Sequence, residues 1–103
     1  MARQQLLTGY ATKLVAAAAT PEKIQNTSKN VCSIVIQALA TNTDFIYWGD
    51  ASNQNFALAP GKSIEIHGDN LDHGASAFLD ISTIYIRVSV NGEGVSYVTL
   101  DQY

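Results

Sequence analysis

Cysteine, proline and charged residues are scarce in this 103-residue chain. The single cysteine, Cys32, cannot form an intramolecular disulfide, which excludes the small disulfide-stapled scaffolds of secreted proteins. No apolar run approaches the roughly 18 residues that a membrane-spanning helix needs, and the first residues do not have the pattern of a cleaved signal peptide. Charged residues make up only 15% of the chain, well below the usual share in soluble domains. Uncharged side chains must therefore cover much of the surface.

The few charges are unevenly distributed. Residues 1–30 carry four basic residues and one acidic residue, and residues 31–103 carry two basic and eight acidic residues, so the two parts have net charges of +3 and −6. A positive leading segment fits an arm that reaches toward a negative neighbour, such as another copy of the chain. The body lacks the clustered lysines and arginines of a phosphate-binding surface, so we expect no nucleic-acid partner. We expect no membrane partner either.

Beyond residue 30, apolar and polar residues alternate with the period of a β-strand. In the segment 31–39, Ile34 and Ile36 share one face with Cys32 and Ala38. In the segment 84–90, four apolar residues should face inward, with Tyr85 and Arg87 outward. Shorter strands are expected at 45–48 and 63–67, where Ile64 and Ile66 should face inward.

Turn signals separate these strands. Ala59-Pro60-Gly61 predicts a type II turn, because proline presets the first central residue and glycine takes the positive φ of the second. The run 91–94 predicts a hairpin turn that joins the strand 84–90 to an antiparallel strand 95–100. The pattern predicts an all-β fold, a small antiparallel β-sandwich or barrel of residues 20–103, large enough for one hydrophobic core.

The leading segment 1–19 is predicted to be an N-terminal arm. Leu6, Tyr10 and Leu14 have helical spacing and four alanines follow, but Gly9 costs a helix about 1 kcal/mol and no good cap precedes it. The segment therefore fits either a helix or an extended arm that orders on a partner. Thr20-Pro21 ends any helix, and residues 22–25 could form a first edge strand.

Candidate ligands for a metal ion gather between His67 and His73, where Asp69 and Asp72 add two carboxylates. Their spacing matches no metal motif, and the Gly, Asp and Asn content is that of a solvated loop, so we predict no metal and no cofactor. Cys32 precedes an apolar strand and is expected to pack as a small hydrophobe. We predict no catalytic residues. An enzyme or metal protein built on the two histidines is the alternative to be tested by the metal content of the purified protein.

Aromatic residues are the more informative set. Tyr85 and Tyr97 both alternate with apolar residues, so the strand period predicts that both face outward on neighbouring strands of the final hairpin. Outward tyrosines on a charge-poor surface fit a protein interface. A sugar-binding platform that uses Trp48, Tyr85 or Tyr97 is the alternative, and Trp48 and Phe56 can also belong to the core.

Several short motifs follow one another in a particular order: Ile34-Val35-Ile36-Gln37-Ala38, Ile46-Tyr47-Trp48-Gly49, Leu58-Ala59-Pro60-Gly61-Lys62-Ser63-Ile64, Ser82-Thr83-Ile84-Tyr85-Ile86 and Gly94-Val95-Ser96-Tyr97. Over residues 20–100 this order resembles the small β-rich virion proteins of tailed bacteriophages, of the capsid decoration, cement, head-fibre and tail-associated kinds. The loop 67–73 and the alanine-containing leader depart from that pattern.

The resemblance implies a structural, non-enzymatic protein of the virion, assembled in the host cytoplasm. A capsid decoration or cement protein would bind the major capsid protein or another virion protein, and would form a homo-oligomer such as a dimer or trimer. The alternative is a tail- or fibre-associated module that binds carbohydrate or the host surface. The residues expected at protein interfaces are Leu6, Leu7, Tyr10 and Leu14 in the arm, and Tyr85, Arg87 and Tyr97 in the body.

Overall fold

The computed structural model describes residues 5–67 and 79–102, with the backbone alone for residues 5–10 and 101–102. This part of the chain consists of β-strands and one short 3₁₀ helix, which confirms the predicted all-β fold, and it contains no helix long and apolar enough to cross a bilayer. The 3₁₀ helix η1 spans Ile81–Thr83. The strands are β1 (Gln5–Leu14), β2 (Glu22–Lys23), β3 (Asn30–Val31), β4 (Ser33–Ala38), β5 (Ile46–Gly49), β6 (Phe56–Leu58), β7 (Ser63–His67), β8 (Leu79–Asp80), β9 (Tyr85–Val88) and β10 (Gly94–Gln102).

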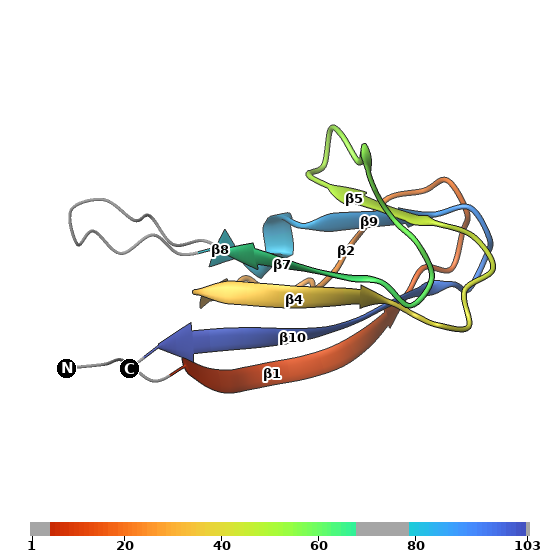
Figure 1. The fold of residues 1–103 in the computed structure, drawn as a ribbon. Helices are drawn as coiled ribbons and strands as arrows, with labels where there is room; N and C mark the ends of the chain where they lie inside the picture. Colours follow the sequence, from red (N-terminus) through yellow and green to blue (C-terminus); the bar gives the residue numbers. More distant parts are fainter. Residues whose placement is uncertain (1–4, 68–78, 103) are drawn as a thin grey trace.

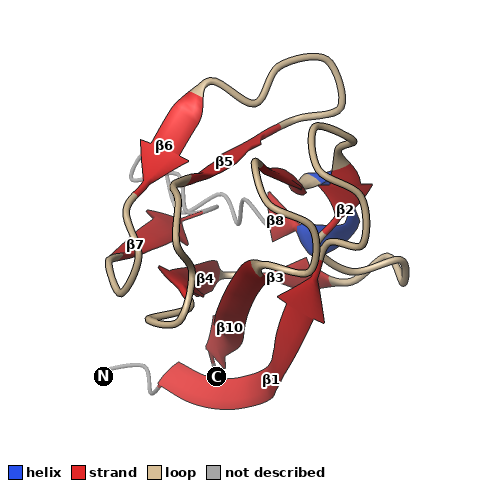
Figure 2. Ribbon diagram, turned by 90° about the vertical axis from the view of Figure 1, so that its right-hand side faces the viewer, coloured by secondary structure: helices blue, strands red, loops and turns tan. Residues whose placement is uncertain are grey.

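The strands form a sandwich of two four-stranded antiparallel sheets (Figures 1 and 2). The first sheet has the order β1-β10-β4-β7, the second has the order β2-β9-β5-β6, and β3 and β8 form a short separate pair. Apolar side chains of the two inner faces form one core, in which the largest fully buried residues are Ile34, Ile36, Ile46, Ile81 and Ile86. The single core agrees with the length of the chain.

The period-two patterns of the sequence set the inner faces of most strands. In β4, Ile34 and Ile36 are buried and pair with Ile66 and Ile64 of β7, which also pack against the core, as predicted. The turn at Pro60 and Gly61 is also confirmed, since Gly61 has a φ of +79° and the Lys62 N–H donates to the Ala59 carbonyl at 3.0 Å.

The leading segment is part of the sandwich, and the helical interpretation of it is wrong. β1 pairs with β10 from Gln5 opposite Gln102 to Leu14 opposite Gly94, with a bulge between Leu7 and Gly9. A short helix with a central glycine has little stability of its own. Pairing with β10 instead satisfies the backbone groups of β1 that point toward β10, and glycine suits a bulge.

The predicted hairpin between residues 84–90 and 95–100 is also wrong. β9 pairs with β2 and β5 in the second sheet, whereas β10 pairs with β1 and β4 in the first sheet. The turn 91–93 therefore carries the chain from one sheet to the other. Val90, predicted to face inward, is 40% exposed at this crossing.

A second crossing lies beside the first and is hydrogen-bonded to it. The chain passes from β4 to β5 through residues 39–45, and there the buried Asn42 side chain donates to the Gly94 carbonyl at 2.8 Å and accepts from the Gly94 N–H at 3.2 Å. Thr43 donates its backbone N–H (2.6 Å) and its hydroxyl (2.8 Å) to one carboxylate oxygen of Glu93. These donors lower the pKa of Glu93 below its ordinary value. Side chains of one crossing thus hold the backbone of the other.

We expect Asn42→Ala to lower the free energy of unfolding by about 2–3 kcal/mol, because both buried polar groups of Gly94 lose their amide partner. Equilibrium urea unfolding measures the change. Thr41→Ala, at the exposed neighbouring position, should change the stability by less than about 0.5 kcal/mol. Equal stability of the two variants would contradict the role assigned to Asn42.

Candidate functional site

The outer face of the second sheet brings aromatic and basic side chains together. In β9, Ile86 and Val88 face the core, so that Tyr85 and Arg87 lie on the opposite side, half-buried, as the sequence predicted. Tyr47 of β5 pairs with Arg87 across the sheet, and Lys23 of β2 pairs with Tyr85. We call Tyr47, Tyr85 and Arg87 the aromatic face.

Two contacts hold Arg87 in place on this face. Its guanidinium carbon lies 4.6 Å from the centroid of the Tyr47 ring, a cation–π arrangement. One terminal nitrogen, Nη2, also donates to the Gln54 carbonyl at 3.3 Å. Tyr47 is not among the predicted interface residues, although its position carried a signal. It follows the buried Ile46 in β5, so that the strand period directs it outward.

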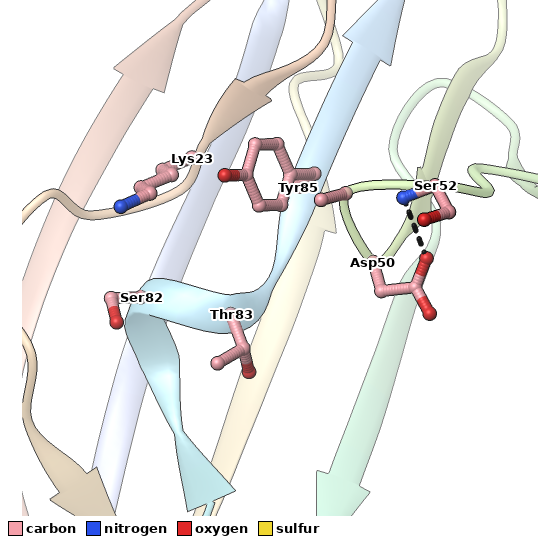
Figure 3. Close-up of a pocket in the computed structure, with 7 residues that line it drawn as sticks. Lys23, Asp50, Ser52, Ser82, Thr83 and Tyr85 are labelled. Carbon is pink, nitrogen blue, oxygen red and sulfur yellow. Dashed lines mark hydrogen bonds between the residues drawn. The ribbon is translucent and has the colours of Figure 1, made fainter.

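Tyr85 borders an open hollow at the end of the sheet, with a volume of about 360 Å³. Figure 3 shows the Tyr85 ring between Lys23 on one side and the Asp50–Ser52 turn on the other, with Ser82 and Thr83 of η1 below it. The hollow thus combines an aromatic ring, an ammonium group, a carboxylate and several hydroxyl groups. This volume lies near the lower end of the range of small-ligand sites, but the hollow is open to solvent and would cover a ligand on one side.

The wall of the hollow opposite Lys23 is a tight turn that follows β5. Asp50 Oδ1 accepts the backbone N–H groups of Ser52 and Asn53, each at 2.9 Å. A Cβ atom at Gly49 would collide with the Asn53 carbonyl, so only glycine allows the turn to fold back this closely. The side-chain amide of Gln54 donates to the Asp50 carbonyl at 2.6 Å and fixes the turn from below.

The other wall depends on Asp80, the N-cap of η1. Its carboxylate accepts hydroxyl hydrogen bonds from Ser28 (2.7 Å) and Ser82 (2.8 Å), as well as the Ser82 N–H at 3.0 Å. The Ser28 hydroxyl, followed by the donors of Ser82, lowers the pKa of Asp80 to about 2. Since Thr83 also donates its hydroxyl to the Asp80 carbonyl at 2.7 Å, the polar groups of η1 are held in a fixed arrangement.

Tyr97 does not belong to the aromatic face, and its predicted outward position is wrong. It is 7% exposed and pairs with Ile36 on the inner face of the first sheet. Burial raises the pKa of its phenol. In β10, the residues that face inward are Val95, Tyr97 and Thr99. The alternate residues include Val98 and Leu100, so the residue pattern of the strand does not show which of the two sets is buried.

The predicted interface residues of the leading segment lie on the other sheet. Leu14 is 53% exposed at the end of β1. Leu7 and Tyr10 pair with Leu100 and Val98 of β10, and Leu6 with Asp101; their side chains lie outside the described part. The predicted set therefore divides into an edge strand of the first sheet and the aromatic face of the second.

Trp48 and Phe56 form a separate pair. Their rings are stacked with centroids 4.8 Å apart, with Trp48 packed against the core and Phe56 61% exposed on the edge strand β6. The three aromatic residues proposed as a sugar platform, Trp48, Tyr85 and Tyr97, therefore do not come together. Of the three, Tyr85 alone lies at the hollow.

Potential metal ligands do not cluster within residues 5–67 and 79–102. His67 lies at the end of β7, exposed, with its Nε2 atom 3.4 Å from a carboxylate oxygen of Glu65. The other members of the predicted group, Asp69, Asp72 and His73, lie outside the described residues. Cys32 is half-buried and its backbone N–H donates to the Leu100 carbonyl at 3.0 Å.

We expect the Asp80 carboxyl to titrate near pH 2 in the folded protein and near 3.8 once its donors are removed. Because its folded pKa is lowered, the stability that Asp80 contributes is present above about pH 4 and is lost as the pH falls toward 2. Ser28→Ala and Ser82→Ala should each raise this pKa in a carboxyl-carbon NMR titration. Thr83→Ala, whose hydroxyl contacts the carbonyl and not the carboxylate, should leave it unchanged. A wild-type pKa near 3.8 would contradict the arrangement.

The comparisons with known proteins leave the function to be argued from this geometry. No protein-family model, curated protein sequence or solved structure matches the chain. The features available for that argument are the aromatic face, the hollow beside Tyr85 and the edges of the two sheets.

Proposed function

We propose that this chain is a structural protein of a tailed-bacteriophage virion, a capsid decoration or cement protein that acts through protein–protein contacts and not by catalysis. The observation that carries the proposal is the aromatic face, where Tyr47, Tyr85 and Arg87 lie together on one side of the second sheet. Tyrosine and arginine are enriched among the residues that dominate the binding energy of interfaces. The motif order of residues 20–100 supports the same role.

The arrangement of the aromatic face suits binding with little loss of entropy. The strand backbone fixes Tyr47 and Tyr85, and the stacking on Tyr47 and the bond to the Gln54 carbonyl restrain Arg87 before any partner arrives. Side chains that are already ordered cost less free energy on association. The partners proposed are the major capsid protein or another virion protein, together with neighbouring copies of the same chain. Many weak contacts around a particle then produce high occupancy.

The charge of the leading segment is partly used within the chain. Lys13, at the end of β1, lies 2.8 Å from the Glu22 carboxylate of β2, and this contact lowers the pKa of Glu22. The pair links the edges of the two sheets. An arm that reaches an acidic neighbour with Lys13 would first have to break this contact, so the proposal does not depend on the positive charge of the leading segment.

Substitutions on the aromatic face test the proposal. Tyr85→Ala and Arg87→Ala, introduced into the phage gene, should each reduce the number of copies per purified particle, with a loss of binding of roughly tenfold or more. Glu65→Gln, on the other sheet, is the control and should load normally. Quantitative mass spectrometry of purified particles gives the copy number, which also distinguishes capsid decoration, with hundreds of copies, from a neck or tail position.

The proposal fails if the wild-type protein is absent from purified particles, or if both variants load like the control. Deletion of the leading segment is not a suitable test, because β1 is a strand of the first sheet and its loss would expose β10. Point substitutions separate binding from folding.

A carbohydrate-binding module of a tail or fibre is the second candidate, favoured by the hollow beside Tyr85. A pyranose could stack on the ring while its hydroxyl groups bond to Asp50, Ser52 and Lys23 (Figure 3). A glycan array with the purified protein decides between the candidates. Saturable glycan binding that is lost in Tyr85→Ala and kept in Arg87→Ala would favour the carbohydrate-binding module. The absence of saturable glycan binding would favour the protein interface.

A further inference from the structure

The outer edge of β1 pairs with no other strand of the described residues, and the register with β10 shows which backbone groups this edge exposes. Directly after β1, Val15 donates its N–H to the Glu93 carbonyl at 2.9 Å, so the backbone of Val15 points toward β10. In β10, the carbonyls of Gly94 and Leu100 point the other way, toward β4, where they accept from Leu39 and Cys32. Since alternate residues of a strand direct their backbone groups to opposite sides, Ala11 and Lys13 face β10. The N–H and C=O groups of Thr12 and Leu14 therefore point away from the sheet, where the described residues provide no further strand.

The other three edges of the sandwich are shorter or carry charge. β2 and β6 contain two and three residues, and β7 contains five residues, including Glu65 and His67. β1 contains ten residues. Short edges and charged edges are the usual protection against pairing with other chains. β1 is long, and its bulge lies between Leu7 and Gly9, so that the residues from Tyr10 to Leu14 form a regular edge. Figures 1 and 2 both show β1 at the margin of the sandwich.

The single charge of β1 does not protect its edge. Lys13 is held by Glu22 of the second sheet at 2.8 Å, on the side of the strand that faces the sandwich. The neighbouring Ala11, Thr12 and Leu14 are exposed. As far as the described residues show, an approaching strand would therefore meet uncharged side chains and a row of backbone donors and acceptors without a strand partner.

We propose that the edge of β1 pairs antiparallel with β1 of a second copy of this chain, so that two four-stranded sheets join into one continuous sheet across a twofold axis. Among the described strands that lie at a sheet edge, only another β1 matches this edge in length. In an antiparallel pair centred near the middle of β1, each Lys13 lies opposite the N-terminal half of the other strand. The two lysines are therefore far apart, and contact between like charges is avoided. A twofold contact of this kind is self-complementary and closes as a dimer. The inference goes beyond the proposed function and does not rest on it.

Amide hydrogen exchange of the purified full-length protein tests the pairing residue by residue. The Ala11 and Lys13 amides bond to β10 and should be protected at every concentration. The Thr12 and Leu14 amides should exchange rapidly in dilute solution and become at least tenfold more protected as the protein associates. Sedimentation equilibrium over the same range should show a rise from 11.1 kDa to twice that mass.

A matched pair of variants isolates the outward N–H of Thr12. Thr12→Ala removes the side chain and its contact with Ser96 at 3.3 Å but keeps the N–H, so the variant should still dimerise. Thr12→Pro removes the N–H that points away from β10 and should give a monomer. The amide-exchange measurement on the wild type keeps the test decisive if Thr12→Pro fails to fold.

Three results would overturn the inference. They are a wild type that stays monomeric up to millimolar concentration, a dimer in which Thr12 and Leu14 remain unprotected, and an open-ended series of oligomers, which would indicate β1-to-β7 pairing. None of these results bears on particle loading, so the proposed virion function can fail or succeed separately.

Discussion

The two sheets are positioned relative to each other where two of the connections between them are hydrogen-bonded to each other. One crossing leads from β4 to β5 and the other from β9 to β10, and Asn42 joins them through both backbone groups of Gly94. Thr43 and Glu93 add a second link at the surface. A Cβ atom at Gly94 would collide with the Lys13 carbonyl, so this glycine also allows the close approach of β1. The hydrogen bonds and close contacts around Gly94 thus fix the positions of β1, β4 and β10 in the first sheet and of β5 and β9 in the second sheet.

This constraint determines what the two outer surfaces present. With β9 committed to the second sheet, Tyr85 and Arg87 lie beside Tyr47 and form one face, restrained by stacking and by the turn after β5. With β10 committed to the first sheet, its outer side needs a further strand, and β1 supplies it. The aromatic face and the free edge of β1 consequently lie on different sheets. A protein with these two surfaces could contact a foreign partner and a second copy at the same time.

The alternation of apolar and polar residues predicted much of the fold, because it shows which side of a single strand is buried and which side is exposed. The alternation around Ile36 and Ile86 identified the buried faces of β4 and β9, and the pair Pro60-Gly61 located a turn with the required positive φ. For the site, the same alternation placed Tyr85 and Arg87 outward. It failed for Tyr97, because both sets of alternate residues in β10 are apolar enough to face a core.

The all-β character, the position of most strands and the inward residues of β4, β7 and β9 follow from the residue pattern alone, because these properties depend on spacing within one strand. Which strands are neighbours depends on contacts between distant parts of the chain. The turn-forming run 91–94 suits a hairpin equally well as a crossing, and Leu6, Tyr10 and Leu14 fit a helix equally well as an edge strand. In both cases the choice is made by partners distant in the sequence, Asn42 for the crossing and β10 for the edge, whose hydrogen bonds outweigh the weak local preference.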